Sequence, residues 1–167
     1  MNLAASALTL RDFVSADSDR VNRLALAAFS QFAEHYNDWS RLAASLSRMS
    51  DLATSGEIIV AEVEGEIAGA VAYIPPGAPK AVFFEPHWPV IRMLVADPAR
   101  RGLGIGRALT DECLRRARRD RAELIALHTS PIMTVALPMY LRMGFAKVRD
   151  APDIFGVPYA VYTKALV

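Results

Sequence analysis

Arg100-Arg101-Gly102-Leu103-Gly104-Ile105-Gly106-Arg107 is the most informative stretch of this chain. It follows an apolar run over residues 89–96 and opens a helical pattern that continues to about residue 119. Its alternating glycines leave places where no Cβ prevents a ligand from approaching the backbone. The amides then lead into a helix N-terminus, which carries unpaired N–H donors and partial positive charge. The stretch therefore predicts a binding site for a phosphate or pyrophosphate group.

Two familiar phosphate loops do not fit this spacing. A dinucleotide-binding loop needs G-x-G-x-x-G, but Arg107 and Ala108 follow Gly106 with no glycine in register. A P-loop needs G-x-x-x-x-G-K-[ST], and no lysine lies near the stretch. The pattern R-x-x-G-x-G, met by Arg101, Gly104 and Gly106, resembles the acetyl-coenzyme A (acetyl-CoA) pyrophosphate loop of the GNAT superfamily of N-acetyltransferases. The alternative is a glycine-rich strand-to-helix turn that binds no ligand.

A second block strengthens the resemblance: Ala136-Leu137-Pro138-Met139-Tyr140-Leu141-Arg142-Met143-Gly144-Phe145 is similar to the closing motif A-x-x-x-Y-x-x-x-G-F of that family. Gly144 is the expected C-cap of a helix, and Phe145 is the expected start of the next strand. A lone Tyr140 would be interpreted as a core aromatic with its hydroxyl at the rim. The glycine loop and this second block, at the distance that separates them here, indicate the family more specifically than either motif alone. The resemblance covers roughly residues 56–148.

Length and composition indicate a single domain over residues 1–167, large enough to bury a core. The chain is 53% hydrophobic without an apolar run of membrane length, and its net charge of +1 favours neither nucleic acid nor a membrane surface. The one cysteine, Cys113, excludes an internal disulfide and suits the reducing cytoplasm, where the protein is expected. With three histidines and one cysteine, no metal site is predicted. Residues 1–6 lack the pattern of a signal peptide.

Arginines gather at residues 115–121, which is typical of either a nucleic-acid patch or a solvated helix face. Helical spacing places two sets of residues on opposite faces: Ile105, Leu109, Cys113 and Ala117 on one, and Arg107, Asp111, Arg115 and Arg118 on the other. The arginines near the end of the helix also complement its dipole. The spacing favours a solvated face, with Cys113 as a small buried hydrophobe rather than a nucleophile.

The periodicity of apolar residues predicts alternating strands and helices. Expected strands cover residues 8–10, 57–63, 66–74, 90–97, 123–128, 145–148 and 159–163. Expected helices run from a cap at Ser15 or Asp17 to about residue 33, and over 39–50, 104–119 and 132–143. Glu64-Gly65 predicts a hairpin turn. The expected fold class is α/β (α+β): a GNAT-like mixed sheet of six to seven strands with about four helices, an antiparallel front half, and parallel strands around the cofactor cleft.

The resemblance also implies a mechanism. The strand before the glycine loop would splay from its neighbour, and the backbone of Leu94, Val95 and Ala96 would pair with the pantetheine arm of acetyl-CoA. The pyrophosphate would lie against the amides of Gly102, Leu103, Gly104, Ile105, Gly106 and Arg107, with Arg101 closing the loop. A bound amine would attack the thioester directly, without an acyl-enzyme. Tyr140 would protonate the departing thiolate, a role that suits a phenol because it is protonated at neutral pH.

Two positions depart from the family pattern. Met133 stands where the family often has asparagine, so one polar contact to the cofactor is expected to be absent. Pro138 lies inside the expected helix and lacks the amide that would bond to the Thr134 carbonyl, which predicts a kink or a later start of the regular helix. Ser130-Pro131, in contrast, is typical of an N-cap and first helical position and favours a start near residue 131.

The motifs leave the general base open, because a carboxylate or a water relay can take the proton of the amine. Glu85, in a proline-rich loop ahead of the central strand, is the first candidate. Asp97 is better explained as turn chemistry, and His128 as a satisfied histidine at the edge of the core. The remaining candidates are His87, Glu34, His35 and ordered water.

Two functions are compatible with these features. The first is an acetyl-CoA-dependent N-acetyltransferase that acts on a primary amine of a small molecule or peptide. The second is a non-catalytic acyl-CoA-binding sensor or regulatory module with the same fold. Tyr140 favours the first, because a pure binder needs no positioned proton donor. The expected partner is a small-molecule amine acceptor, without nucleic acid or a membrane, and a homodimer is left open. Residues 15–50 and 149–158, which set acceptor specificity in the family, carry no motif that identifies the acceptor.

Overall fold

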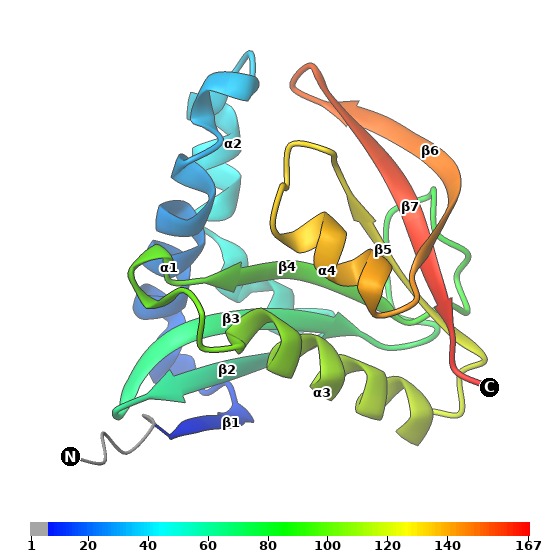
Figure 1. The fold of residues 1–167 in the computed structure, drawn as a ribbon, viewed down its shortest axis with the longest axis horizontal. Coiled ribbons are helices and arrows are strands. Elements are labelled where there is room, and N and C mark those ends of the chain that lie inside the picture. Colours follow the sequence, from blue (N-terminus) through cyan, green and yellow to red (C-terminus); the bar gives the residue numbers. More distant parts are fainter. Residues whose placement is uncertain (1–6) are drawn as a thin grey trace.

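The computed structural model describes residues 7–167, in which helices cover both faces of one mixed β-sheet (Figure 1). The strands are β1 (Leu8–Asp12), β2 (Glu57–Val63), β3 (Glu66–Ile74), β4 (Val90–Ala96), β5 (Leu124–Thr129), β6 (Ala146–Ile154) and β7 (Val157–Ala165). The α-helices are α1 (Ser18–Ser30), α2 (Trp39–Leu46), α3 (Ile105–Arg119) and α4 (Ala136–Arg142). Residues 1–6, at which no signal peptide is expected, lie outside the described part of the chain.

The sheet has the strand order β1-β2-β3-β4-β5-β7-β6. Strands β4 and β5 run parallel, and every other pair of neighbours is antiparallel. This arrangement confirms the expected fold class, with an antiparallel front half and a parallel pair in the middle of the sheet. None of the helices within residues 7–167 has the length and apolar character needed to cross a bilayer.

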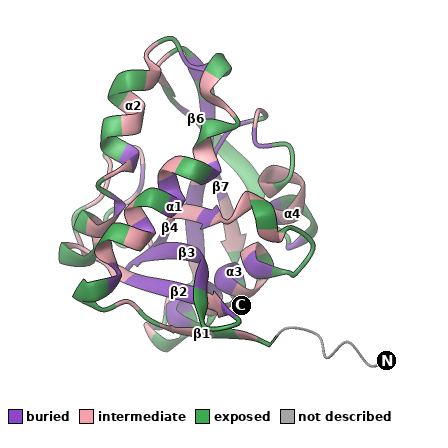
Figure 2. Ribbon diagram, turned by 90° about the vertical axis from the view of Figure 1, so that its left-hand side faces the viewer, coloured by how far each residue is buried: buried purple, intermediate pink, exposed green. Residues whose placement is uncertain are grey.

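Strands β2 and β3 are buried on both faces, because helices lie above and below them (Figure 2). Alternate residues of β2 belong to different cores: Ile58 and Val60 pack with α1, whereas Ile59 and Ala61 pack with α3. Both strands therefore read as nearly continuous apolar runs, which is the pattern of a strand covered on two sides. The turn between them places Glu64 and Gly65 at φ 54° and 77°, as a tight hairpin with two left-handed residues requires.

Helix α3 packs one face on the sheet and leaves the other in solvent, as predicted. Leu109 and Cys113 are fully buried, and Arg115 and Arg118 are exposed. The helix approaches β3 so closely that a Cβ at Gly69 would collide with the side chain of Ile105. Close contact of this kind needs glycine, because any other residue would force the helix away from the sheet.

Arg116 is a charged residue on the buried face of α3. Its guanidinium donates to Asp12 at 2.5 Å, to Glu57 at 2.8 Å and to Glu112 at 3.1 Å. Asp12 lies on β1 and Glu57 on β2, so these ion pairs join α3 to the edge of the sheet. Within the arginine cluster of residues 115–121, Arg116 thus forms buried ion pairs, whereas Arg115 and Arg118 lie on a solvated face.

Two helices are shorter than predicted. Helix α2 ends at Leu46, and a 3-10 helix over Met49–Thr54 takes up the rest of the predicted span. Helix α4 begins at Ala136 rather than near residue 131, since residues 130–135 form turns in which the Met133 amide donates to the Ser130 carbonyl at 3.0 Å. This later start places Pro138 at the third position of the helix, where no intrahelical partner for its amide is missing.

The last two strands are longer than predicted and form one hairpin that turns at Phe155 and Gly156, with φ of 43° and 83°. The strand predicted over 145–148 continues to Ile154, so residues 149–154, which were predicted as loop, lie in the edge strand β6. Every side chain from 146 to 150 is exposed, and a strand that is solvated on both faces has no apolar alternation for sequence analysis to detect.

Arg116→Ala is expected to lower the free energy of unfolding by about 2–4 kcal/mol, because it leaves three carboxylates without their shared cation. Thermal or urea unfolding measures the change. Arg118→Ala, on the exposed face of the same helix, is the matched control and should change stability by less than about 0.5 kcal/mol. Equal effects of the two substitutions would show that the buried ion pairs do not hold α3 to the sheet.

Candidate active site

Strands β4 and β5 lie side by side at only one end. Val90 pairs with Ala126, and the Ala126 amide donates to the Pro89 carbonyl at 3.0 Å. No further pair joins these two strands within residues 7–167, and Figure 1 shows β5 turning away from β4 toward α4. The parallel pair therefore opens into a wedge between adjacent strands, the splay that the resemblance leads one to expect before the glycine loop.

A β-bulge bends β4 at the mouth of this wedge. Arg92 pairs with Ala72 and Val95 with Ala70, so that Met93 and Leu94 together oppose one residue of β3. Met93 adopts φ 57°, a left-handed conformation that few residues other than glycine take. Such a bulge re-aims the neighbouring side chains. Leu94 thereby comes to line the two cavities that meet here.

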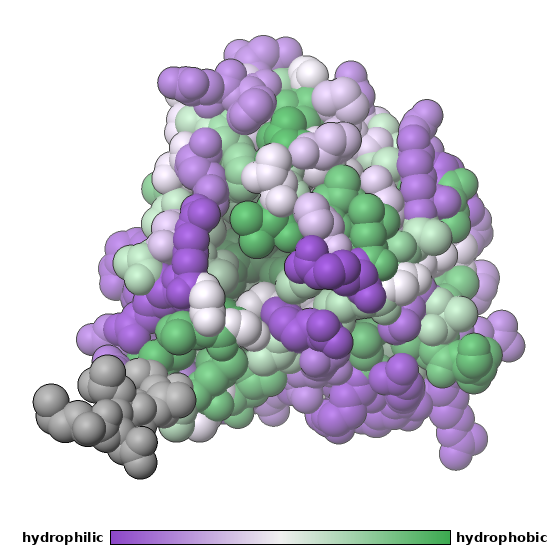
Figure 3. Space-filling model, viewed as in Figure 1, coloured by the Kyte–Doolittle hydropathy of each residue, from purple (hydrophilic) through white to green (hydrophobic). Residues whose placement is uncertain are grey.

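The first cavity lies between the glycine loop and the ends of α1 and α4, and has a volume of about 650 Å³. Figure 3 shows a hollow near the centre of this face of the molecule, with hydrophobic side chains inside and hydrophilic ones around it. Every residue that the sequence analysis assigns to the cofactor lines this cavity: Leu94, Val95, Ala96, Arg101, Gly102, Leu103, Gly104, Ile105, Gly106 and Arg107. We call it the loop cleft.

The backbone amides of the glycine loop are unpaired. In the described part of the chain, the N–H groups of residues 101–107 donate to no backbone or side-chain acceptor, and the first paired amide is that of Ala108, which donates to the Gly104 carbonyl at 3.0 Å. Gly102 and Gly104 have φ of 82° and 74°, so glycine is required at both for the loop to curve. Consecutive free amides before a helix N-terminus form a ready anion site.

Gly106 has a different reason to be glycine. It lies in the first turn of α3, and a Cβ there would make only ordinary contact with Met139, at 3.6 Å from its sulfur. Neither backbone conformation nor packing therefore requires glycine at this position. Because Gly106 lines the loop cleft, the absence of its side chain keeps the cleft open to a ligand.

Arg101 spans the entrance of the loop cleft. Its Nη2 donates to Oε1 of Gln31, just beyond the end of α1, at 2.9 Å. The preceding turn is held by Asp97, whose side chain accepts from the Ala99 amide at 2.9 Å, which confirms turn chemistry for that residue. Arg101 thus closes the loop against α1, as the resemblance implies, and keeps its remaining N–H groups at the rim.

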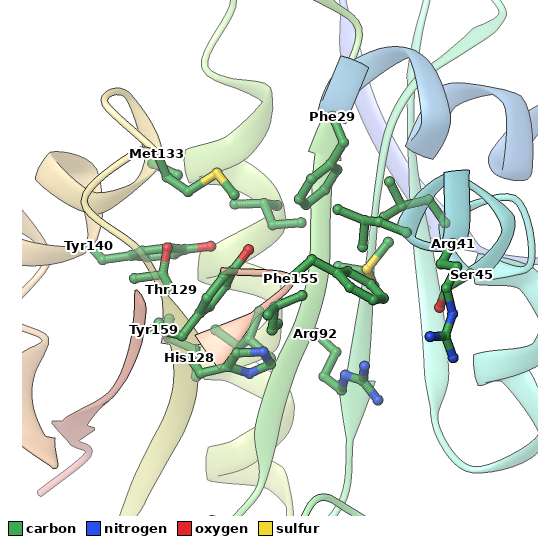
Figure 4. Close-up of a pocket in the computed structure, with 18 residues that line it drawn as sticks. Phe29, Arg41, Ser45, Arg92, His128, Thr129, Met133, Tyr140, Phe155 and Tyr159 are labelled. Atoms are coloured by element: carbon green, nitrogen blue, oxygen red, sulfur yellow. The ribbon is translucent and has the colours of Figure 1, made fainter. Parts of the chain in front are cut away.

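The second cavity, of about 380 Å³, contains Tyr140 and is called the Tyr140 pocket here. Figure 4 shows the hydroxyl of Tyr140 pointing into it. Burial raises the pKa of this phenol above its ordinary value, so the hydroxyl keeps its proton at neutral pH. Phe29, Leu94, Met133 and Ala136 line both this pocket and the loop cleft. The two cavities are therefore neighbours that share one wall.

His128, at the far end of β5, lines the Tyr140 pocket and is not the satisfied histidine expected from the sequence. Its Nδ1 is buried without a hydrogen-bond partner in the described structure. The ring packs among Phe83, Phe84 and Tyr159, with centroids 5.2–5.7 Å away. Burial, together with the positive charge of Arg92, lowers the pKa of His128 to about 4. The imidazole is therefore neutral at physiological pH.

A pair of phenols stiffens the opposite wall of this pocket. The hydroxyls of Tyr159 on β7 and Tyr36 lie 2.5 Å apart, and burial raises the pKa of both. Phe155 and Ile154 from the β6–β7 hairpin complete the wall. Tyr36, Ile154 and Phe155 come from the segments 15–50 and 149–158 that carry no motif, and Tyr159 comes from the strand predicted over 159–163, so no motif in the sequence brought them together.

Glu85, the first candidate for the general base, does not line either cavity. Its Oε1 lies 3.4 Å from Nη1 of Arg149, and about half of its side chain is exposed. His87 in the same loop is also exposed and outside the lining. The structure does not bring Glu85 to Tyr140, because the proline-rich loop packs against the outer side of the β5–β7 region instead of entering the wedge.

The site thus combines a parallel strand pair that opens, a loop of free amides beside it and a buried phenol on the adjoining wall, all in one α/β fold. The sequence profile described as the Acetyltransferase (GNAT) family matches residues 19–145. Because this match spans most of the chain and includes both the glycine loop and Tyr140, the chain belongs to the GNAT acetyltransferase family.

Relatives agree with this assignment. The chain is 36% identical over 110 residues to a mycothiol acetyltransferase from Cellulomonas flavigena, a match that covers 61% of this chain and 30% of the length of that protein. A GCN5-related N-acetyltransferase structure from Rhodopseudomonas palustris aligns over 99% of both chains with a TM-score of 0.76 and 18% identity. The yncA structure from Salmonella typhimurium, solved with its cofactor acetyl-CoA, aligns over 96% of this chain and 95% of its own, with a TM-score of 0.68 and 19% identity.

The buried His128 should make stability fall in acid. Above pH 6.5 the ring is neutral in both the folded and the unfolded state. As the pH falls from 6.5 toward 4, the ring becomes protonated in the unfolded chain but stays neutral in the folded chain. Over this pH interval the free energy of unfolding of the wild type falls by up to about 3 kcal/mol. His128→Phe should remove that loss, as measured by urea unfolding at pH 7 and pH 4.5. If wild type and variant lose the same stability over this interval, the buried imidazole does not titrate as described.

Proposed function

We propose that this protein is an acetyl-CoA-dependent N-acetyltransferase that acts on the amine of a small molecule. The observation that carries the proposal is the wall shared by the loop cleft and the Tyr140 pocket. A donor bound in the cleft and an acceptor bound in the pocket would meet at Leu94 and Ala136, beside the Tyr140 hydroxyl. Holding two reactants at one point is the largest contribution a rigid site can make to a transfer reaction.

The loop cleft fits the donor in three respects. The free amides of residues 101–107 suit a pyrophosphate, and the partial positive charge at the start of α3 adds to them. The unpaired side of β4 offers backbone groups to an amide-containing arm, as an added strand would use them. Acetyl-CoA is bound in solved relatives with the same fold, including yncA and a GNAT acetyltransferase from Elizabethkingia anophelis.

In this proposal the side chains of the protein transfer protons during the reaction. Acetyl-CoA supplies the activated acetyl group: the neutral amine nitrogen bonds to the thioester carbonyl carbon, and the carbon–sulfur bond breaks. Tyr140 gives its proton to the sulfur, and the proton lost by the nitrogen restores the phenol, so that one hydrogen passes in net from amine to thiol. Burial keeps Tyr140 protonated until that moment. His128 in the same pocket is neutral at physiological pH and adds no charge to it.

Calorimetric titration with acetyl-CoA, beside NAD and ATP, followed by turnover with a panel of amines, tests the proposal. Selective binding of acetyl-CoA together with release of free thiol in the presence of an amine supports it. Binding without turnover of any amine would favour the non-catalytic acyl-CoA sensor. A preference for NAD or ATP would exclude both functions.

Gly104→Val should abolish binding of acetyl-CoA, because it places a β-branched residue at φ 74° and disturbs the amides that hold the pyrophosphate. Calorimetry measures the loss. Gly65→Val is a matched control: it carries the same conformational strain, at φ 77° with no neighbour within 4 Å, but lies in the β2–β3 turn. Equal affinity of Gly104→Val and Gly65→Val for acetyl-CoA would show that the glycine loop is not part of the binding site.

Tyr140→Phe should lower kcat by about 100-fold or more, since it removes the proton donor, while the affinity for acetyl-CoA stays within about 2-fold. Thiol release and calorimetry measure the two quantities. Tyr162→Phe is the control, because Tyr162 is also buried, at 8% exposure, but lines neither cavity. Full activity of Tyr140→Phe across pH 6–10 would falsify the proton-donor role.

A further inference from the structure

The Tyr140 pocket carries positive charge without a counter-charge. Arg41 on α2 and Arg92 on β4 both line it, and none of the residues that line it in the described chain is acidic. His128, the other ionisable nitrogen base in the lining, is neutral. A guanidinium beside a partly closed apolar pocket is left with an unbalanced charge, which attracts an anion.

Arg92 is the strongest sign of this imbalance. It is the one charged residue in the apolar run of β4, and its side chain is half-buried. Within residues 7–167 no hydrogen bond or ion pair reaches its guanidinium, and burial alone lowers its pKa. A guanidinium that is partly shielded from water and has no carboxylate partner is unfavourable in a folded protein, and a bound anion would supply the missing partner.

The other arginines of the chain make the contrast clear. Those that are likewise shielded from solvent in the described structure each hold at least one carboxylate: Arg11, Arg20, Arg100 and Arg116. The unpaired ones elsewhere are exposed to water, which solvates them. Arg92 therefore departs from the rule that this protein otherwise follows for shielded arginines.

Arg41 reinforces the same end of the pocket. Arg41 is exposed, and its guanidinium lies 5.8 Å from the centroid of the Phe155 ring and forms no ion pair in the described chain, so it adds a solvated positive charge beside Arg92. In Figure 4 the guanidinium groups of Arg41 and Arg92 lie on one side of the pocket, and the hydroxyls of Tyr140 and Thr129 lie on the other. Aromatic and aliphatic side chains, among them Phe29 and Phe155, occupy the space between.

We infer that the acceptor is a small amine that also bears an oxyanion, a carboxylate above all, which Arg92 binds at the end of the pocket opposite Tyr140. This inference rests on the proposed function and names its substrate class. The polar ends of the acceptor are separated by an apolar body that fits the aromatic wall, as in 4-(aminomethyl)benzoic acid or 6-aminohexanoic acid. Guanidinium and carboxylate form two parallel charge-assisted bonds, which fix the orientation of the amine as well as its affinity.

The same arrangement rejects other classes of amine. A polyamine or a lysine-rich peptide would bring further positive charge to a pocket that already holds two arginines and no acid. Like charges at short range disfavour such a complex. A neutral amine would leave Arg92 unpaired and would lose the bond that orients it.

Turnover with matched acceptors tests the inference. 4-(Aminomethyl)benzoic acid and 6-aminohexanoic acid are each compared with the corresponding carboxamide, and with the phosphonate analogue, at saturating acetyl-CoA. The carboxylate or phosphonate should exceed the carboxamide in kcat/KM by about 10- to 100-fold. The order of carboxylate and phosphonate identifies the oxyanion. Acetylation of carboxamides at least as efficient as that of the acids would overturn the inference and leave the acetyltransferase function standing.

Substitution then assigns the preference to a residue. Arg92→Met keeps the length of the side chain and should reduce the acid-to-carboxamide ratio of kcat/KM by about 10- to 100-fold, mainly through KM, whereas Arg92→Lys should retain part of it. Arg118→Met, on the solvent face of α3, is the control and should leave the ratio unchanged. An unchanged ratio in Arg92→Met would contradict the assignment.

A binding measurement separates this inference from catalysis. The N-acetyl derivatives of 4-(aminomethyl)benzoic acid and of 4-(aminomethyl)benzamide are titrated into the protein loaded with coenzyme A. The acid should bind at least about 10-fold more tightly than the amide, and Arg92→Met should remove that difference. Equal binding of the two, or binding of neither, would overturn the inference even if turnover is observed with other amines. Absence of turnover with every amine, despite selective binding of the acid, would instead count against the proposed function alone.

Discussion

The divergence of β4 from β5 is the constraint on which the rest of the structure depends. Two parallel strands normally satisfy their backbone groups against each other, yet here the ladder stops after Val90. A bulge at Met93 bends β4 away, and the polar edge it exposes must find another partner. A wedge in the middle of a sheet is tolerated because the flanking strands are covered by helices on both faces and cannot collapse into it.

The two cavities that open from this wedge are lined by different kinds of polar group. The loop cleft presents backbone amides, whose dipoles are fixed by glycine geometry and need no counter-ion. The Tyr140 pocket presents side chains whose protonation is set by burial: a phenol that keeps its proton and an imidazole that does not take one. Arg92 adds a permanent charge that nothing in the described chain balances. Both cavities thus present unpaired groups suited to an anion, backbone amides in one and a guanidinium in the other.

The sequence predictions are accurate where the signal is a contiguous pattern of residues, and they fail where it depends on distant parts of the chain. The β2–β3 hairpin, helix α3 and the cofactor loop rest on contiguous patterns, and all of them lie where the pattern placed them. The β6–β7 hairpin and the start of α4 were misjudged, because an edge strand lacks apolar alternation and because Pro138 is harmless only when its position in the helix is known. Glu85 was chosen for its place in the chain, and its loop packs elsewhere.

The sequence by itself determined the family, the glycine loop and the tyrosine, since each of these is a local pattern in which spacing carries the chemistry. Tertiary structure decided the acceptor side, because Arg41, Arg92, His128 and Tyr159 come from four separate elements and share no motif. In the sequence, the arginine end of that pocket is marked by Arg92, a charged residue within the apolar run over residues 89–96. Whether such a residue is a solvated surface group or an unpaired charge depends on what packs around it, and only the folded chain specifies those neighbours.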